Sequence, residues 1–517
     1  MRRKNSNVLQ AEHEIPRFTD AEFMTGRAVL EIFNLEQENV EKFEACRGIA
    51  YDNDRVRKNV TIVTVTLKPR PTVCPACGQQ NYVVKCYEEK QIKHSILNNR
   101  PLLLNYRARR YRCQVCRRTF YERNPFVFKS QKISADTVIC ILMDLRKPEV
   151  TFTQIAERYN ISPTSVASIF DQHVDMKRLP LPAYMDIDES YSFKTPESSY
   201  VCMFIDYETG EPIDILPSRR KEELLAYFKQ IPLSERKNVK IVGMDMYNTY
   251  REVVKEVFPN AYISADVFHV VKDMNTKADR IRIRVMKRFK SDSVEYYLLK
   301  HFNWMLFKDQ NSVDRDGKLL FDPERERKYN YKLRMELNYK EILNRILDID
   351  PELRQAIELK EKCVDFYENS TYSTAKKKLN GLIGEFENAS TEEMRNFGGT
   401  LRNWRNEIVN SFIVVSHTYE VDRKDGQVVS KANMVNSGVM ERRNSSVKTI
   451  KKVTNGMGNW PRFRNRVLYA LRKDATFFME PIDEPKALRW SRAKKKAEEE
   501  EETIKTVELT DDMEDKS

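Results

Sequence analysis

Two pairs of closely spaced cysteines constrain the fold of this chain more than any other feature. Cys74 and Cys77 form the first pair, Cys113 and Cys116 form the second, and two residues separate the cysteines of each pair. Two such knuckles can present four thiolates to one tetrahedral Zn²⁺, so the two segments are expected to meet in the folded chain. The interval between them exceeds the ~15–20 residues of the common zinc pattern, which predicts a β-hairpin between the knuckles.

The residues around the knuckles indicate a small β-rich module. Residues 60–66 are β-branched throughout, and residues 102–112 can supply a further strand with a basic edge. Cys86 and His94 lie within the interval and could replace a ligand, but a buried thiol and a surface histidine are the simpler interpretation. Chance pairing of two such motifs is the alternative for the whole module. Nine cysteines in a long chain argue against a disulfide scaffold and for a reducing compartment.

The charge of the chain is unevenly distributed. Lysine and arginine outnumber aspartate and glutamate by 89 to 77, which gives a net charge of +12. Residues 498–517 hold ten acids and two lysines, so this tail carries −8 and the rest of the chain +20. A basic body suits a polyanionic partner because each neutralised phosphate releases counterions, although a solvated basic surface explains the charge as simply. The acidic tail is predicted to be disordered.

No apolar run approaches the ~20 residues that cross a bilayer, and no apolar stretch follows the basic N-terminus. We therefore expect neither export nor membrane insertion, and a cytoplasmic location.

A pair of short helices is predicted after the cysteine module. Residues 152–159 place apolar side chains on one helix face, and residues 160–162 break the helix. Ser162 can cap a second helix that begins at Pro163 and is rich in serine and threonine. This pattern is typical of a helix-turn-helix, with an ordinary pair of core helices as the alternative. The side chains expected to face DNA are those of Ser162, Thr164, Ser165 and Ser168.

Short strands and helices then alternate. Residues 184–189, 200–207 and 211–216 are predicted strands, and helix, strand, helix and strand follow at residues 221–231, 239–244, 249–258 and 261–265. This order indicates a ribonuclease-H-like mixed sheet with helices on its faces. Asp188 lies near the end of the first strand and Asp245 ends the fourth. We expect these two strands to be neighbours at the centre of the sheet, so that the two acids meet.

A third acid follows a long insertion. Residues between Asp266 and about Asn433 are charged and poor in glycine, which predicts an all-helical insertion. The segment that begins at Asn436 then opens a helix that can bring Glu441 to the two aspartates. The same helix carries basic side chains suited to DNA phosphates, at Arg442, Arg443, Lys448, Lys451 and Lys452.

The order of these motifs resembles the insertion-sequence transposases of the ISL-three family, from about Phe33 to Leu471. The resemblance rests on the following stretches: Ile187-Asp188-Glu189; Met244-Asp245-Met246-Tyr247 with Tyr250; Pro259 to Ala261; Asp266 to Val271; and Gly438, Glu441, Asn444, Lys448 and Lys451. It also includes the two cysteine knuckles and the helix-turn-helix. The last family motif usually reads Asn-Gly-x-x-Glu-Gly-x-Asn, whereas here Ser437 replaces the first Asn and Arg442 the Gly after Glu441.

The resemblance implies a DDE-type DNA transposase whose catalytic acids are Asp188, Asp245 and Glu441. These acids would hold Mg²⁺ or Mn²⁺, because hard cations prefer carboxylate oxygens. Asp186 would face the same way as Asp188 and is its rival as the first ligand, while Asp266 and His269 would orient the ligands or contact phosphate. The expected partners are the element ends and target DNA, and pairing two ends requires at least a dimer.

The expected fold is a multidomain α/β protein with a zinc-ribbon-like N-terminal module, a helix-turn-helix and a ribonuclease-H-like core. Its segments are residues 1–28 unassigned, 29–125 zinc-binding, 130–178 helix-turn-helix, 183–270 core, 271–433 helical insertion, 434–475 core with the Glu441 helix, and 476–517 charged tail. Two functions of other classes stay open. One is a DNA-binding regulator or domesticated protein without catalysis, and the other is a nuclease on the same fold.

Overall fold

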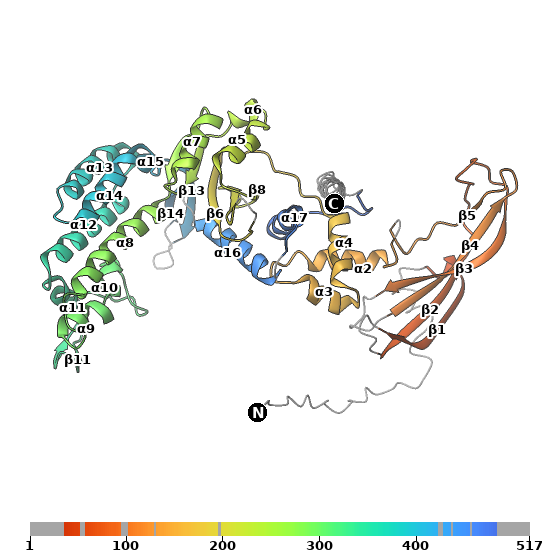
Figure 1. Cartoon of the computed structure of the whole chain (residues 1–517), viewed down its shortest axis with the longest axis horizontal. Helices are drawn as coiled ribbons and strands as arrows, with labels where there is room; N and C mark the ends of the chain where they lie inside the picture. Colours follow the sequence, from red (N-terminus) through yellow and green to blue (C-terminus); the bar gives the residue numbers. More distant parts are fainter. Residues whose placement is uncertain are drawn as a thin grey trace, which may run out of the picture. The chain divides into compact units, whose positions relative to one another are not determined.

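A computed structural model gives the structure of the chain (Figure 1). It describes residues 36–51, 57–94, 102–128, 131–194, 198–421, 428–435, 438–454 and 457–482. The unassigned N-terminal segment and the acidic tail of the sequence analysis lie outside the described residues. The chain forms two compact units, one of Met1–Asp175 with Thr476–Ser517 and the other of Met176–Ala475.

The first unit begins with a long five-stranded sheet. After a short 3-10 turn at Gln37–Asn39, the strands are β1 (Val40–Tyr51), β2 (Arg57–Leu67), β3 (Tyr82–His94), β4 (Leu102–Cys113) and β5 (Thr119–Tyr121). Their order is β1-β2-β4-β3, and β5 pairs with β4. Strands β2 and β4 are parallel, while β3 and β4 are antiparallel and join the two cysteine knuckles. The hairpin predicted between the knuckles is therefore confirmed.

Three helices complete the first unit: α2 (Ala135–Asp144), α3 (Phe152–Tyr159) and α4 (Pro163–His173). Thr151 caps α3 in a capping box with Gln154, and α3 ends at Asn160, whose φ of 53° is left-handed. Ser162 caps α4, with Pro163 at the first helical position. These positions confirm the two helices and the turn predicted from the sequence.

The last described residues of the chain return to the end of α4. The Phe478 amide donates to the His173 carbonyl at 2.8 Å, and the Ile482 amide donates to the Gln172 carbonyl at 2.8 Å. The His173 ring is buried, with Nδ1 2.7 Å from the Phe478 carbonyl. The segment that follows the second unit thus belongs structurally to the first.

A mixed five-stranded sheet forms the centre of the second unit. Its strands are β6 (Tyr184–Ser190), β7 (Val201–Asp206), β8 (Pro212–Leu216), β9 (Ile241–Met244) and β10 (Tyr262–Ala265), in the order β10-β9-β6-β7-β8. Strands β6, β7 and β8 form an antiparallel meander, whereas β9 is parallel to β6 and to β10. The strands predicted from the sequence are confirmed, and the first and fourth of them are neighbours at the centre.

Alternation along β6 gives the sheet two different faces. Met185 and Ile187 join an apolar cluster with residues of α5 (Lys221–Lys229) and α7 (Asn248–Val257). The short helix α6 (Leu233–Arg236) links α5 to β9, and α7 links β9 to β10. Asp186 and Asp188 face the other way, where α16 (Gly438–Val453) contacts β6. Helix α17 (Trp460–Leu471) packs against α16 and β8.

The insertion between β10 and α16 has its own apolar core. Its helices are α8 (Val267–Met286), α9 (Val294–His301), α10 (Trp304–Phe307), α11 (Tyr339–Leu347), α12 (Pro351–Glu368), α13 (Tyr372–Glu387), α14 (Glu392–Asn403) and α15 (Arg405–Asn410). A large cluster of buried residues joins α8 to α15, and α15 packs against the edge strand β10. Asn410 Nδ2 donates to the Ile263 carbonyl at 2.9 Å, which covers part of that edge.

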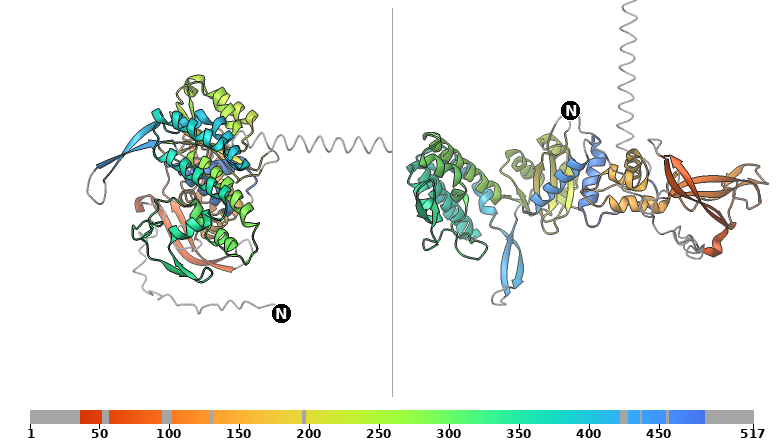
Figure 2. Two further views of the ribbon diagram at one scale, coloured as in Figure 1. Left: turned by 90° about the vertical axis from the view of Figure 1, so that its left-hand side faces the viewer. Right: turned by 90° about the horizontal axis from the view of Figure 1, so that it is seen from below.

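The prediction that the insertion is all-helical is wrong. It contains a short hairpin of β11 (Lys328–Asn330) and β12 (Met335–Leu337), and a longer one of β13 (Val414–Val421) and β14 (Val428–Met434). The longer hairpin projects away from the central sheet (Figure 2). The prediction rested on charge and low glycine content, which do not distinguish a helix from a strand. Among the described helices, none combines the length and the apolar character needed to cross a membrane.

Candidate active site

Three carboxylates meet at the centre of the sheet in the second unit. Asp188 lies near the end of β6, Glu189 follows it, and Asp245 comes directly after β9. Because β6 and β9 are parallel neighbours, their carboxyl ends lie at the same edge. One oxygen from each of the three carboxylates lies within 4.8 Å of the other two. The structure thus brings Asp188 and Asp245 together as predicted, with Glu189 as the third acid of the cluster.

Burial and mutual repulsion make these carboxylates reluctant to ionise. Burial and the charge of Glu189 raise the pKa of Asp188 to about 6. Burial, followed by the charges of Glu189 and Asp188, raises the pKa of Asp245 to about 7. Asp245 Oδ1 is buried and has no hydrogen-bond partner among the described residues. Oxygen donors that repel each other and lack a partner are suited to a hard divalent cation.

Glu189 is held in place from two sides. Arg219 forms an ion pair with its Oε1, and the Tyr250 hydroxyl donates to its Oε2 at 2.9 Å. The Arg219 guanidinium also lies over the rings of Tyr200 and Tyr247, at 4.2 and 5.0 Å from their centroids. Glu189 is therefore a fixed charge beside the other two acids. Glu189 belongs to the Ile187-Asp188-Glu189 stretch of the family resemblance, but no role was predicted for it.

Asp186, the rival of Asp188, is more deeply placed. Its side chain is 3% exposed, and burial followed by the charge of Asp266 raises its pKa. It pairs across the sheet with Gly243, where an added Cβ would lie 2.6 Å from a Val435 methyl and 2.9 Å from Asp186 Oδ1. The glycine lets the chain between β14 and α16 approach the sheet. Asp186 is not a member of the carboxylate cluster at the end of the strand.

Asp266 and His269 lie at the start of α8. Asp266 Oδ1 accepts from the Phe268 amide at 3.1 Å and so caps the helix. His269 Nε2 lies 3.7 Å from Asp266 Oδ2, and the imidazole lowers the pKa of Asp188, which places it close to the cluster. Both residues lie beside the three acids, the neighbourhood in which the sequence analysis placed them.

Helix α16 reaches the cluster through Asn444 rather than through Glu441. Asn444 Nδ2 donates to Asp188 Oδ2 at 2.7 Å, and the Asn444 side chain is buried. Glu441, one turn earlier on the same helix, is exposed and is not a member of the cluster. Asn444 belongs to the same family motif as Glu441, but no role was predicted for it, although an amide three residues after the expected acid shares its side of the helix.

The basic residues of α16 differ in their surroundings. Arg443 Nε donates to the Gly210 carbonyl at 2.8 Å and its Nη1 to the Leu471 carbonyl at 3.2 Å, so this arginine fastens the helix to the core and not to a phosphate. Lys451 is half-buried, with Nζ 5.1 Å from the centroid of the Phe193 ring. The side chains of Arg442, Lys448 and Lys452 are exposed.

The residues predicted to face DNA on α4 fall into two groups. Ser162 Oγ accepts from the Ser165 amide at 3.1 Å and lies 2.8 Å from the hydroxyls of Thr164 and Ser165, so it serves the helix cap. Thr164 and Ser168 are exposed on the helix surface.

The four cysteines of the first unit form a second cluster. The sulfur atoms of Cys74 and Cys116 are 3.6 Å apart, as are those of Cys77 and Cys113, and all four lie within 4.8 Å of one another. Tetrahedral zinc with Zn–S bonds of about 2.3 Å spaces its sulfurs about 3.8 Å apart. The Cys116 amide donates to Cys113 Sγ at 3.5 Å and helps to lower the pKa of that thiol to about 7. The four thiols fit a zinc ion.

Neither rival ligand joins the cysteine cluster. Cys86 is half-buried on β3. His94 is 1% exposed, with Nδ1 2.8 Å from the Ser134 hydroxyl, so the prediction of a surface histidine is wrong. The reason is that β3 continues under the start of α2, where the Ser134 amide donates to the Lys93 carbonyl.

Comparison with known proteins places both clusters in one class, the transposases. A family described as "Transposase" matches residues 185–420, which include the acids of β6 and β9. A second family, described as "zinc-finger of transposase IS204/IS1001/IS1096/IS1165", matches residues 70–116, which include all four cysteines. The first match ends before α16, so it does not extend to Glu441.

A curated relative supports the same assignment. The transposase for insertion sequence element IS1001 of Bordetella parapertussis is 22% identical over 272 residues, a match that covers 50% of this chain and 65% of the relative. The two family models and this relative show that the chain resembles the ISL-three family of insertion-sequence transposases. Its cysteine module is a zinc ribbon of that family.

Proposed function

We propose that this chain is a DDE-type DNA transposase that binds the ends of an insertion sequence, cuts them and joins them to target DNA. The observation that carries the proposal is the cluster of Asp188, Glu189 and Asp245 at adjacent strand ends, inside the segment that matches transposases. The sheet order β10-β9-β6-β7-β8, with a meander followed by parallel strands, supports a ribonuclease-H-like core.

Asp188, Asp245 and Glu441 would hold Mg²⁺ or Mn²⁺. When bound, the metal supplies an activated water and stabilises charge on the phosphate. Asn444 orients the Asp188 carboxylate through its 2.7 Å hydrogen bond. Arg219 and Tyr250 fix Glu189 beside the ligands, where its charge favours a cation.

Glu441 completes the site from α16 in this proposal. It stands one turn before Asn444, whose amide already contacts Asp188, and residues three apart on a helix share a side. Its exposed side chain can rotate about three bonds to approach the cluster. Glu441 is the expected third acid because the family resemblance assigns that role to this position, and a shared helix side with Asn444 is the structural support.

DNA would be bound by residues outside the cluster. We infer that α3 and α4 form a helix-turn-helix in which the exposed Thr164 and Ser168 face DNA. Arg442, Lys448 and Lys452 would contact phosphates near the cut, while Arg443 leaves this group because it is engaged within the core. Zinc would order the ribbon module, and the protein would act as a dimer or larger assembly on the bacterial nucleoid in the cytoplasm.

A substitution of Glu441 tests the catalytic assignment. Glu441→Gln removes a charge but keeps the shape, so we expect cleavage of element-end DNA to fall at least about 100-fold while DNA affinity stays unchanged. Glu252→Gln, at an exposed glutamate of α7 on the other face of the sheet, is the matched control and should cleave normally. Cleavage by Glu441→Gln at the wild-type rate would refute the assignment.

The products of the wild-type reaction distinguish a transposase from the two alternatives, a nuclease and a DNA-binding regulator. A transposase joins the freed 3′ end to a target duplex in the presence of Mg²⁺. A nuclease on the same fold cuts without joining, and a regulator binds without cutting.

A further inference from the structure

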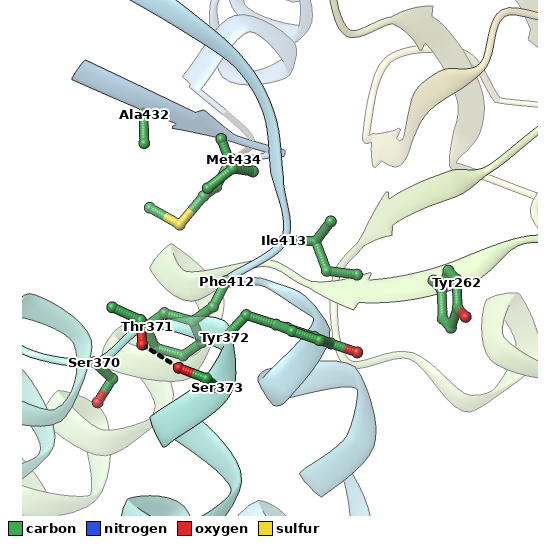
Figure 3. Close-up of a pocket in the computed structure, with 10 residues that line it drawn as sticks. Tyr262, Ser370, Thr371, Tyr372, Ser373, Phe412, Ile413, Ala432 and Met434 are labelled. Atoms are coloured by element: carbon green, nitrogen blue, oxygen red, sulfur yellow. Dashed lines mark hydrogen bonds between the residues drawn. The ribbon is translucent and has the colours of Figure 1, made fainter. Parts of the chain in front are cut away.

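A second feature of the catalytic unit is an open pocket beside the edge strand β10. Its volume is about 740 Å³, within the roughly 300–1,000 Å³ of small-molecule sites. It lies between the start of β10, the start of α13 and the base of the β13–β14 hairpin. In Figure 3 the ring of Tyr372 extends from the start of α13 toward Tyr262, with Ile413 above it and Ala432 and Met434 on the hairpin. No acid or base is among the described residues that line the pocket.

The lining combines exposed aromatic rings with hydroxyl groups. Tyr262 is 57% exposed and Tyr372 is 49% exposed, although large rings are usually buried or engaged at a binding surface. Ser370 Oγ is buried without a hydrogen-bond partner among the described residues, and the hydroxyls of Thr371 and Ser373 lie 3.0 Å apart at the pocket wall. Flat apolar surfaces with a few polar groups at their margin suit a planar heterocycle.

The margin of the pocket favours an anion. Helix α13 begins at Tyr372 with a capping box between Thr371 and Thr374, which leaves the backbone N–H groups of Tyr372 and Ser373 for a ligand. Residues 370–384 contain no acid, and the second turn carries the exposed Lys376 and Lys377. Lysines near a helix N-terminus oppose the helix dipole, so this helix start accumulates positive potential. A planar group with an attached phosphate therefore matches both the aromatic lining of the pocket and the positive potential at the start of α13.

The pocket is connected to the carboxylate cluster by packed side chains. Phe412, which forms part of its wall, stacks on Tyr367 with ring centroids 5.8 Å apart and planes at 12°. Tyr367 in turn packs against the apolar cluster that includes Ala265, the residue before Asp266. On the other wall, Met434 is followed by Val435, which lies against Gly243 and near Asp186. Tyr262 in the pocket pairs with Ile241 at the start of β9, so the pocket lies toward the start of the strands whose other ends carry the acids.

We propose that the pocket binds an unpaired nucleobase of the DNA being processed, stacked on Tyr372 and Tyr262, with its phosphate at the start of α13. The inference rests on the proposed function, since it requires DNA at the carboxylate cluster. A base removed from the duplex exposes a planar face that aromatic side chains can stack on whatever its identity. The pocket would hold the strand in place while a phosphate farther along it lies at the acids, because Tyr262 pairs with Ile241, four residues before Asp245.

Three DNA probes separate base binding from backbone binding. They are a duplex with a short single-stranded overhang, the same duplex with an abasic overhang that keeps the phosphates, and a blunt duplex. Affinities are measured by fluorescence anisotropy with the full chain in EDTA-free buffer without Mg²⁺, so that no strand is cut and the zinc module stays intact. We expect the wild-type protein to bind the overhang with bases about ten-fold more tightly than the abasic overhang.

Substitutions in the pocket test whether the preference for an overhang with bases arises there. Tyr372→Ala should lose the preference for bases and keep its affinity for the blunt duplex, whereas Tyr372→Phe should retain the preference. Ala432→Glu, at an exposed pocket position on β14, should also lose it because the added charge repels the phosphate. Tyr331→Ala is the matched control, since Tyr331 is an 87% exposed ring of the insertion that is not among the pocket residues, and it should behave as wild type.

Other results would overturn the proposal. Equal wild-type affinity for the two overhangs, or an equal loss in Tyr372→Ala and Tyr331→Ala, excludes a base in this pocket while leaving the transposase assignment intact. Failure of the wild-type protein to bind any of the three DNAs overturns the proposed function together with the pocket. A Tyr372→Ala protein that keeps its base preference but loses self-association in sedimentation would assign the pocket to a second copy of the chain.

Discussion

At the scale of single residues, the carboxylates at the ends of β6 and β9 repel each other in the folded chain. Asp188 and Asp245 are half-buried, and each raises the cost of ionising the other. For Asp245 the pKa is about 7 in the folded chain against an ordinary value of 3.8. Between those two pH values the folded state keeps a proton that the unfolded state has lost. Stability without metal therefore falls as the pH rises from about 4 to about 7, and the penalty is complete above that range.

The substitution Asp245→Asn removes this penalty. In metal-free buffer at pH 8 we expect the variant to melt a few degrees higher than the wild type, and we expect the difference to vanish near pH 4. Added Mg²⁺ should raise the melting temperature of the wild type and leave that of the variant unchanged, because the amide cannot replace the carboxylate as a ligand. Differential scanning calorimetry in the presence and absence of Mg²⁺ measures both effects.

The control for this prediction is Asp292→Asn, at an exposed acid in the loop before α9, which should change neither quantity. A wild-type protein that is more stable than Asp245→Asn at pH 8 without metal would show that the cluster is not a site of charge repulsion.

At the scale of elements, the sequence predicts the central sheet well and helix α16 less well. The strands that become β6 to β10 are marked by β-branched and apolar runs between turn residues, and parallel pairing of β6 with β9 follows from their order. Helix α16 buries Met440, Asn444, Val447 and Ile450, a stripe that places Glu441 at its border. Apolar periodicity predicts which side of a helix is buried. It does not predict whether a residue at the border of that side, such as Glu441, faces the carboxylates, because this depends on how contacts such as those of Arg443 rotate the helix about its axis.

One signal in the sequence does identify a site residue on α16: a polar residue among the apolar residues of the buried side. Asn444 occupies such a position, and its amide pairs with Asp188 across 256 residues of chain. Glu189 and Arg219 could not be found in this way. Their pairing depends on the loop after β8 turning back over the sheet, and no periodicity in the sequence encodes that turn.

The substitution Asn444→Ala tests the link between α16 and β6. Loss of the amide donor leaves Asp188 unoriented and raises its pKa further, since the hydrogen bond favours the charged form. We expect Mg²⁺ affinity in the cleavage reaction to fall by about 10–100-fold and the pH of half-maximal cleavage to move upward. A titration of Mg²⁺ at several pH values gives both numbers.

Ser445→Ala, at the next and exposed position of the helix, is the matched control. A purely structural role for Asn444 would lower the melting temperature without moving the pH profile. That outcome would contradict the assignment of Asn444 as the residue that positions Asp188.

At the scale of the whole molecule, the chain divides into two compact units, each with its own cluster of potential metal ligands. The four cysteines lie in the first unit, and the carboxylates lie in the second. The core around the thiols is small, because Cys74, Tyr111, Cys113 and Phe120 are its buried members and Cys77, Tyr82 and Cys116 pack against them. A core made partly of metal ligands has little apolar surface to hold it together once the metal is removed.

We therefore expect zinc to control the stability of the first unit alone. Cys113→Ser should abolish binding of one zinc ion per chain, lower the melting transition of the first unit and weaken DNA binding. The Mg²⁺-dependent rise in the melting transition of the second unit should persist, because the apolar cluster under α5 and α7 and the core of the insertion contain no zinc ligand. Cys86→Ser, on strand β3 of the same module but outside the cluster, should leave zinc content and both transitions unchanged. Metal analysis with calorimetry measures these effects, and loss of the Mg²⁺ response in Cys113→Ser would mean that the two units do not fold independently.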